Sequence, residues 1–275
     1  KFLIVHEKPL AAMHNVAPGY RQIKTIEDSF RDYDLAIILD CGELSRIGKV
    51  QNILSKEKSI INIDHHFSNS LFGTVNVVAS KASSTAEAIF EIFKAWKVNL
   101  TKTMAQNLYF GILTDTGSFR YQNTTSRTHE IAAELLRFQI SPDVFYRKVY
   151  EDLDFRSFQL IFKVINHLKF YHKGKIVSVS LPREVLSKSD GNFDLKDKIF
   201  YLLRMMQDVQ VIVLFSEIGS RSTRVNFRST KTTDVAAIAK LFDGGGHKAA
   251  SGCMIDGNIK DAEKKVLREV LARVA

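Results

Sequence analysis

The stretches Asp34–Gly42 (DLAIILDCG) and Ser59–His66 (SIINIDHH) determine the expected fold. Each begins as a nearly continuous apolar run, and each apolar run ends at a carboxylate. Runs of this length are typical of strands that are buried on both faces, as in parallel sheets. We therefore expect two such strands, with Asp40 and Asp64 at their carboxyl ends.

Strands alternate with helices through the first half of the chain. The segment Ser84–Lys97 begins with Ser-Thr-x-Glu, a helix-capping pattern, and continues with helical spacing that is expected to pack Trp96 against the protein. This βαβ rhythm predicts a doubly wound, mostly parallel sheet. The other expected elements are a strand at Phe2–Val5 and helices at Glu43–Lys56, Asn107–Leu113 and Ser126–Phe138.

The second half has strands with better alternation of apolar and polar residues, which indicates a sheet with partly covered faces. At 275 residues, two domains are the better expectation. We predict an N-terminal α/β domain over 1–152, a connecting helix over 153–172 and a smaller mixed-sheet α/β domain over 173–275. The elements expected after residue 153 are helices Phe155–Leu168, Asp234–Phe242 and Lys260–Val274, and strands Lys175–Leu181, Val209–Phe215 and Ser222–Ser229.

The charge of the chain favours an anionic partner such as a nucleotide or a nucleic acid. It has 39 Lys and Arg against 30 Asp and Glu, a formal net charge of +9 and a pI near 9.4. Cys41 and Cys253 lie far apart in the sequence, form no disulfide framework and suit a reducing cytoplasm. No apolar run is long enough to cross a membrane, so we expect no membrane partner.

Carboxylates and imidazoles gather where predicted strands and helices end. They are Asp40, the triplet Asp64-His65-His66, and Asp115. Ligands of open α/β sheets bind beyond the carboxyl ends of the strands, and this donor set suits Mn²⁺, with Mg²⁺ or Co²⁺ also possible. Each feature alone has a plainer interpretation. A strand-end Asp is usually a turn residue, and two adjacent His on a strand point to opposite faces.

A glycine-rich segment in the second half predicts an anion site. Gly244, Gly245 and Gly246 allow backbone N–H groups to approach an anion, and His247 and Lys248 add donors. A hinge or a helix C-cap explains the same glycines. Arg228 ends a predicted strand and could bind a phosphate with its forked guanidinium, although a single arginine is more often a solvated surface residue.

Five motifs in this order resemble the DHH phosphoesterase superfamily, with its DHH-associated C-terminal domain. The size of the chain resembles the nano-RNase and pAp phosphatase subfamily. The resemblance implies a metal-dependent hydrolase of short oligoribonucleotides and possibly of 3′-phosphoadenosine 5′-phosphate (pAp). The motifs are LDCGELSRIG (39–48), IDHHFSN (63–69), SSTAE (83–87), GILTDTGSFRY (111–121), and FRS (227–229) with GGGHKAASG (244–252).

The resemblance also implies roles for individual residues. In the first domain, Asp40 would bridge two metal ions, and His65 and Asp115 would complete the ligands of one of them. His66 would face the substrate phosphate or support the ligands, and Asp64 would orient the imidazoles. In the second domain, the phosphate would be held by Arg228, Ser229, Gly244, Gly245, Gly246, His247 and Lys248.

One family motif has no counterpart in this sequence. The family opens with a strand and a His-x-x-x-Asp-x-Asp motif, which supplies the remaining metal ligands, and this spacing does not occur in the 275 residues. Loss of an interior strand would expose apolar neighbours and ladder groups. We therefore expect several tens of further residues upstream, and little or no catalysis by a chain that truly starts at Lys1.

Other functions remain open at this point. They include a cyclic-dinucleotide phosphodiesterase, a single-strand exonuclease or a polyphosphatase of the same superfamily. A nucleotide- or RNA-binding module without catalysis is the alternative from another class. The cysteine usage indicates a cytoplasmic protein, and the resemblance further implies a homodimer.

Overall fold

The computed structural model contains two compact units, residues 1–152 and 153–275. It describes residues 4–7, 16–26, 33–187, 195–219, 221–230 and 233–274. The first unit has parallel sheets with helices, and the second has a mixed sheet with helices, so the predicted α/β class is confirmed. Over the described ranges, no helix is long and apolar enough to cross a membrane.

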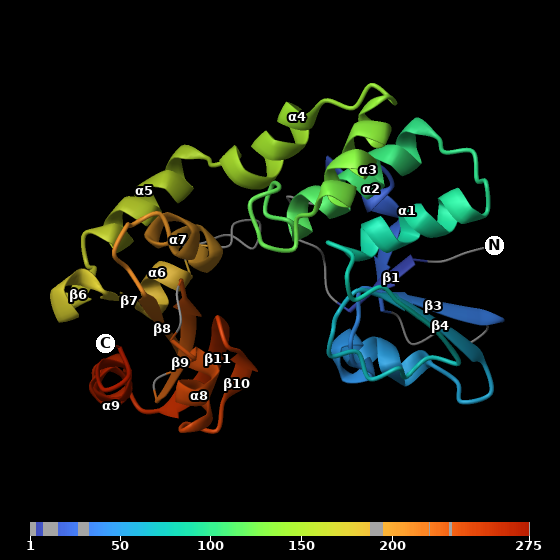
Figure 1. The fold of residues 1–275 in the computed structure, drawn as a ribbon. Helices are drawn as coiled ribbons and strands as arrows, with labels where there is room; N and C mark the ends of the chain where they lie inside the picture. The colour runs from blue at the N-terminus through green and yellow to red at the C-terminus, as the bar shows by residue number, and fades with distance from the viewer. Residues whose placement is uncertain are drawn as a thin grey trace. The chain divides into compact units, whose positions relative to one another are not determined.

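The first unit is organised around a parallel sheet with the strand order β3-β4-β5. Leu39 pairs with Ile63, so β3 and β4 end side by side, as the sequence predicted (Figure 1). A separate parallel pair, β1 and β2, lies earlier in the chain. The strands are β1 Ile4–His6, β2 Ile23–Thr25, β3 Leu35–Leu39, β4 Ser59–Asp64 and β5 Val75–Val78. Residues 2 and 3 of the predicted first strand lie outside the described ranges.

The helices of the first unit pack on a core that includes Ile112, Ile131 and Leu135, all fully buried. Ser84 caps the helix that follows it, α1, by accepting a hydrogen bond from the Glu87 N–H, as the sequence predicted. The helices are η2 Tyr20–Gln22, η3 Leu44–Ile53, α1 Thr85–Ala95, α2 Lys102–Asp115, α3 Ser126–Leu136, α4 Pro142–Tyr146 and the π-helix η4 Arg147–Glu151.

The predicted amphipathic helix at Glu43–Lys56 is wrong. The segment is a 3₁₀ helix, η3, interrupted at Gly48, whose backbone is non-helical with φ 58° and ψ −134°. Residues with a Cβ rarely adopt this positive φ, so the backbone at this position favours glycine. The expectation for Trp96 is also wrong: it follows α1 as its C-cap, where the chain leaves the helix, and it is 75% exposed.

One face of the first unit's sheet is only partly covered. Strand β3 is the edge of the described three-stranded sheet. Leu35, Ile37 and Leu39 share one face of this strand, and their exposed fractions are 43%, 58% and 50%. Burial of β3 therefore contributes less to stability than burial of an enclosed strand would.

The second unit is a six-stranded sheet with the order β10-β11-β9-β8-β7-β6. Strands β7 and β8 are parallel, and every other described pair is antiparallel. The predicted strand Ser222–Ser229 has the same bounds as β9. The strands are β6 Lys169–Tyr171, β7 Ile176–Leu181, β8 Val211–Gly219, β9 Ser222–Ser229, β10 Gly245–His247 and β11 Ala250–Asp256.

Helices cover both faces of this sheet. Helices α8 and α9 bury one face, with Phe215 and Phe227 in the core, while α5 and α7 bury the other face over β7 and β8 (Figure 1). The result is a three-layer unit in which the central strands are fully enclosed. The helices are α5 Phe155–Ile165, η5 His172–Gly174, α6 Arg183–Leu186, α7 Leu195–Leu203, α8 Val235–Lys240 and α9 Ile259–Leu271.

The connecting helix predicted over 153–172 is shorter than expected. Helix α5 starts after its N-cap Asp154 and ends at Ile165. Residues Lys169–Tyr171 instead form β6, which pairs antiparallel with β7. The backbone N–H and C=O groups of these residues therefore form ladder hydrogen bonds with β7 in place of helical hydrogen bonds. Either kind of hydrogen bond satisfies the backbone groups.

Candidate metal and phosphate sites

Asp40 stands directly after β3 in a left-handed backbone conformation, with φ 57°. Its N–H donates to the Ile63 carbonyl of the neighbouring strand at 3.0 Å. The Thr85 hydroxyl donates to Asp40 Oδ1 at 2.8 Å, from the first residue of α1. A non-glycine residue in this region costs conformational energy, so the surrounding bonds must hold Asp40 in place.

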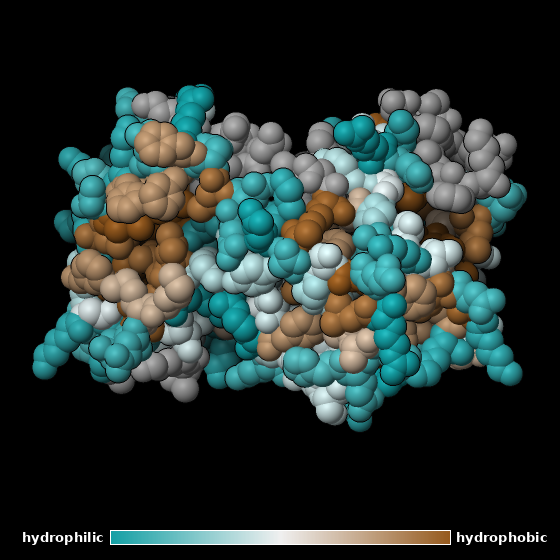
Figure 2. Space-filling view, turned by 90° about the horizontal axis from the view of Figure 1, so that it is seen from above, coloured by the Kyte–Doolittle hydropathy of each residue, from teal (hydrophilic) through white to brown (hydrophobic). Residues whose placement is uncertain are grey.

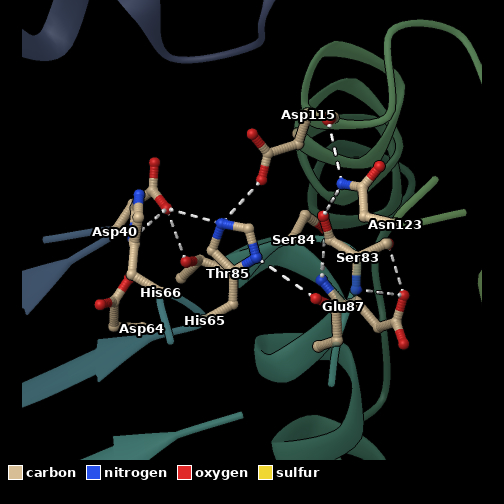
Figure 3. Close-up of polar contacts among 12 residues, drawn as sticks. Asp40, Asp64, His65, His66, Ser83, Ser84, Thr85, Glu87, Asp115 and Asn123 are labelled. Atoms are coloured by element: carbon tan, nitrogen blue, oxygen red, sulfur yellow. Dashed lines mark hydrogen bonds and ion pairs between the residues drawn. The ribbon is translucent and has the colours of Figure 1, made fainter. Parts of the chain in front are cut away.

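His65 points into the same group from the end of β4 (Figure 3). Its Nδ1 lies 3.3 Å from the Ala82 carbonyl oxygen, which can only accept, so Nδ1 carries the proton. The opposite nitrogen, Nε2, lies 3.1 Å from Asp115 Oδ2 and 3.6 Å from Asp40 Oδ1. In the neutral ring this nitrogen has a lone pair directed at two carboxylates.

Asp64 is fully buried and orients His66. The His66 Nδ1–H donates to Asp64 Oδ1 at 2.7 Å, and the Asn69 amide donates to Asp64 Oδ2 at 2.6 Å. Burial raises the pKa of Asp64, but the hydrogen bonds from His66 and Asn69 outweigh it, and the net pKa lies below its ordinary value. Because β4 ends at Asp64, strand alternation does not separate the two histidines, whose ring centroids are 4.9 Å apart.

Asp115 is the last residue of α2, and the loop after it returns to the same place. The Asn123 amide donates to the Asp115 carbonyl at 3.2 Å and to the Ser83 carbonyl at 2.7 Å (Figure 3). Burial raises the pKa of the Asp115 carboxyl; His65 opposes this shift and the nearby Asp40 carboxylate adds to it. A cation between the two carboxylates would relieve their repulsion.

This donor set fits a divalent cation. Ligand atoms of Asp40, His65 and His66 lie within 4.8 Å of one another, and Asp115 adds a carboxylate oxygen beside His65. The side chains of Asp40 and Asp115 are 55% and 37% exposed, so an ion and a substrate can reach them. Carboxylate oxygens with imidazole nitrogen are ligands that suit Mn²⁺.

The sequence did not single out the residues that support this group. Thr85, Asn69 and Asn123 bind Asp40, Asp64 and Asp115, respectively. Glu87 is buried one turn into α1, where it accepts hydrogen bonds from the Ser83 hydroxyl at 2.5 Å and the Thr128 hydroxyl at 3.0 Å. The Ser-Ser-Thr-Ala-Glu motif was the available signal, but it also fits a helix cap.

In the second unit, strand register brings two predicted residues into one row. Arg228 on β9 pairs with Ala250 on β11, and Ala250 pairs with His247 on β10. Only alanine therefore separates the two positions on the sheet. The Arg228 guanidinium carbon lies 4.6 Å from the centre of the Phe200 ring, which holds the planar group against α7.

Close contacts require glycine at two of the three positions Gly244–Gly246, but not at the third. A Cβ at Gly244 would lie 2.4 Å from the Gly252 carbonyl oxygen, and its N–H closes α8 by donating to the Ala239 carbonyl. A Cβ at Gly246, where φ is 135°, would lie 2.6 Å from a backbone oxygen. A Cβ at Gly245 would meet no atom within 4 Å. The helix-end interpretation therefore holds for Gly244. Of the other predicted residues, Ser229 is buried and Lys248 is exposed.

Comparison with known proteins identifies the family. The chain is 31% identical over 238 residues to a bifunctional oligoribonuclease and PAP phosphatase NrnA of Thermus thermophilus, covering 85% of this chain and 69% of that protein. It is 32% identical to a probable NrnA of Streptococcus mutans, with 86% and 75% covered. Models of the DHH family N-terminal domain and of the DHHA1 domain match residues 3–112 and 174–275. The chain belongs to the DHH family.

DHH proteins are metal-dependent phosphoesterases, and within them this chain is NrnA-like. The resemblance inferred from the five motifs is confirmed by the two domain models and the relatives. An exopolyphosphatase-related protein from Bacteroides fragilis has the same fold, with a TM-score of 0.87 at 24% identity, over 98% of this chain and 82% of that one.

Proposed function

We propose that this DHH protein hydrolyses short oligoribonucleotides to mononucleotides and removes the 3′-phosphate of pAp. The supporting observation is the convergence of His65 Nε2 with the carboxylates of Asp40 and Asp115 at 3.6 and 3.1 Å. The relatives from Thermus thermophilus and Streptococcus mutans are named for both activities, the second as a probable enzyme.

The first unit would hold Mn²⁺ through Asp40, His65 and Asp115. When bound, a divalent ion supplies an activated water nucleophile and offsets the negative charge of the phosphate. The chain contributes the positions of the ligands: Ala82 fixes the His65 ring, Thr85 fixes Asp40, and Asn123 ties the end of α2 to the Ser83 turn. Asp64 accepts the hydrogen bond of His66 Nδ1, so that His66 Nε2 is the ring nitrogen that remains to accept one.

The second unit would bind the phosphate of the substrate. Arg228 supplies a forked donor whose plane is fixed on Phe200, and its row in the sheet continues to His247. The backbone at Gly244–Gly246, with Lys248 and Ser229, completes the predicted set. A guanidinium on a rigid strand binds a phosphate at a lower cost in side-chain entropy than a mobile one does.

The test is Mn²⁺-dependent release of mononucleotide from a 5′-labelled diribonucleotide, and of phosphate from pAp. Asp40→Asn is expected to abolish both. Asp34→Asn is the matched control, because Asp34 is an exposed carboxylate at the opposite end of the same strand. Equal activity in the two variants would overturn the proposal. Oligonucleotide binding without any turnover would favour the nucleotide-binding module, and turnover of cyclic dinucleotides alone would favour that class of phosphodiesterase.

Three further predictions belong to this proposal. Mn²⁺ is the expected ion of a two-metal centre, and activity with Mn²⁺, Mg²⁺ and Co²⁺ after chelation tests it. A homodimer is expected from the family, and light scattering measures it. A cytoplasmic location is expected, and cell fractionation tests it.

A further inference from the structure

Strand β9 presents a row of polar side chains along one face. Val225 and Phe227 point into the core beneath α8 and α9, so Arg224, Asn226 and Arg228 occupy the opposite face. Successive positions on one face of a strand are about 7 Å apart. Two guanidinium groups and a carboxamide are therefore spaced evenly along the strand, beginning at the arginine already assigned to the phosphate.

The cover of this face decreases along β9, from Arg228, which contacts Phe200 of α7, to Arg224, which is exposed. Helices α5 and α7 pack on β7 and β8, where Ile212 and Leu214 are fully buried. Arg224 is exposed, and Asn226 and Arg228 are partly exposed. Figure 2 shows apolar residues gathered over α5, where Phe155, Phe158 and Phe162 are exposed. The accessibility of the polar row follows from the exposure of its own side chains.

Small residues on β11 lie beside two positions of the row. Asn226 pairs with Gly252 and Arg228 pairs with Ala250. A Cβ at Gly252 would lie 3.3 Å from Asn226 Nδ2 and 2.9 Å from the Val225 carbonyl oxygen. Gly252 is therefore packed closely against the Val225 carbonyl and the Asn226 amide group, while Arg224 pairs with the longer side chain of Met254.

Polar atoms in these rows lack partners. Within the part of the chain that the structure describes, Asn226 Oδ1 and Ser216 Oγ are buried without a hydrogen-bond partner. Ser216 pairs with Arg224 across β8 and β9, and Leu214 pairs with Asn226. Buried polar groups are normally satisfied, and the unpaired atom of Asn226 is an acceptor, so this side chain can bind a phosphate only through the N–H donors of its Nδ2 group.

We propose that Arg224, Asn226 and Arg228 form a track for successive phosphates of a single-stranded oligonucleotide. This inference rests on the proposed function and extends it to a subsite that Arg224 and Asn226 provide. Guanidinium groups bind phosphate through two parallel N–H donors, and the Asn226 amide adds neutral N–H donors between them. The strand repeat of about 7 Å is comparable with the length of one nucleotide in an extended chain.

The track makes binding depend on substrate length. Arg228 holds the first phosphate, and Arg224 lies two strand repeats further on, about 13 Å along β9. Only a substrate with at least three phosphates in a chain reaches it. A 5′-phosphorylated tetraribonucleotide spans the track, whereas pAp, with two phosphates, ends before Arg224.

The test variant is Arg224→Gln in the full chain. For the tetraribonucleotide we expect KM to rise about five- to tenfold with kcat unchanged, as for the loss of one hydrogen bond of ordinary strength. The KM for pAp is expected to stay within twofold of the wild-type value. Binding of a fluorescent tetraribonucleotide in EDTA gives a second readout. The slope of log K against log salt should become shallower by about 0.7, the contribution of one phosphate contact to a single strand.

Arg268→Gln is the matched control. Arg268 is an 81% exposed arginine on α9, which packs against the opposite face of the sheet. The Arg268→Gln substitution removes the same positive charge and should change neither KM nor the salt slope. Asn226→Ala is the second variant, with a smaller rise in KM for the tetraribonucleotide and no change in salt slope, because no charge is lost.

Two outcomes overturn the track. Arg224→Gln could raise KM equally for pAp and the tetraribonucleotide, or it could leave both KM and the salt slope unchanged. Failure of the proposed function gives a different result, because the wild type would then turn over neither substrate. The salt slope in EDTA would still measure the phosphate contact of Arg224 in that case.

Discussion

The two units build their candidate sites by different means. In the first unit, the groups come from three places far apart in sequence: the ends of β3 and β4 and the end of α2. In the second unit, they lie on one face of a sheet, where β9, β11 and β10 are in fixed register. The first site depends on hydrogen bonds that hold loops, and the second depends on strand register, where a slip of one residue would reverse every side chain.

The two units also differ in the charge of their sites and in the burial of their strands. The first gathers carboxylates and imidazoles, which attract a cation, and the second presents guanidinium groups, which attract an anion. The first unit's β3 leaves Ile37 58% exposed, whereas Ile212 on β8 of the second unit is fully buried. Because the first site attracts the cation and the second attracts the phosphate, substitutions in the first site should change kcat and metal affinity. Substitutions in the second site should change KM.

After the loss of activity expected for Asp40→Asn, the largest expected effect is at Asp115. Asp115→Asn should lower kcat at least about 100-fold, because the ion loses a charged ligand beside His65. Steady-state kinetics in Mn²⁺ measure it. Asp143→Asn, at an exposed carboxylate in the first turn of α4, is the control. Activity within threefold of wild type would show that Asp115 is no ligand.

The next effect belongs to the second unit. Arg228→Lys keeps the charge but loses the fork and the contact with the Phe200 ring, so KM should rise about tenfold while kcat stays nearly constant. Arg268→Lys is the control. A fall in kcat at unchanged KM would place Arg228 in the chemical step and remove the contrast between the units.

A smaller effect is expected at Thr85. Thr85→Val has nearly the same shape but cannot donate to Asp40, so Mn²⁺ affinity should fall about tenfold. Calorimetric titration with Mn²⁺ measures it, with Thr103→Val, at an exposed position of α2, as the control. Equal affinities in the two variants would mean that Thr85 does not position Asp40.

The smallest expected effect on activity is at Glu87, which stabilises rather than binds. Glu87→Gln should lower the free energy of unfolding by about 1–2 kcal/mol, because its carboxylate accepts two buried hydroxyl hydrogen bonds. Urea denaturation measures it. Glu91→Gln, an exposed position on the same helix, should change stability by less than about 1 kcal/mol. A larger loss at Glu91 would contradict this assignment.

Strand positions were predicted well where the pattern was strong. The apolar run Ser59–Asp64 and the alternating run Ser222–Ser229 have the same bounds as β4 and β9. The short strand β5, Val75–Val78, was missed, because four residues carry too little periodicity. The helix predicted at Glu43–Lys56 failed at Gly48, because the spacing of apolar residues does not reveal a positive φ at a glycine.

The candidate site was predictable in part. Strand-end carboxylates share one edge of a parallel sheet, so Asp40 and Asp64–His66 were expected together, and the structure brings them together with Asp115. Their chemical roles remain predictions. Thr85 and Asn123 were not found, because hydroxyl and amide residues are common in caps and loops, and only their hydrogen bonds distinguish them.

The sequence by itself determined the family, the α/β class and the residues rich in chemistry, because motif order and apolar runs are local properties of the chain. Only the tertiary structure decided which nitrogen of His65 faces the carboxylates, because that depends on the Ala82 carbonyl across a loop. It also decided that the face of β9 that carries Arg224, Asn226 and Arg228 is partly exposed, because burial of a strand face depends on which helices cover it.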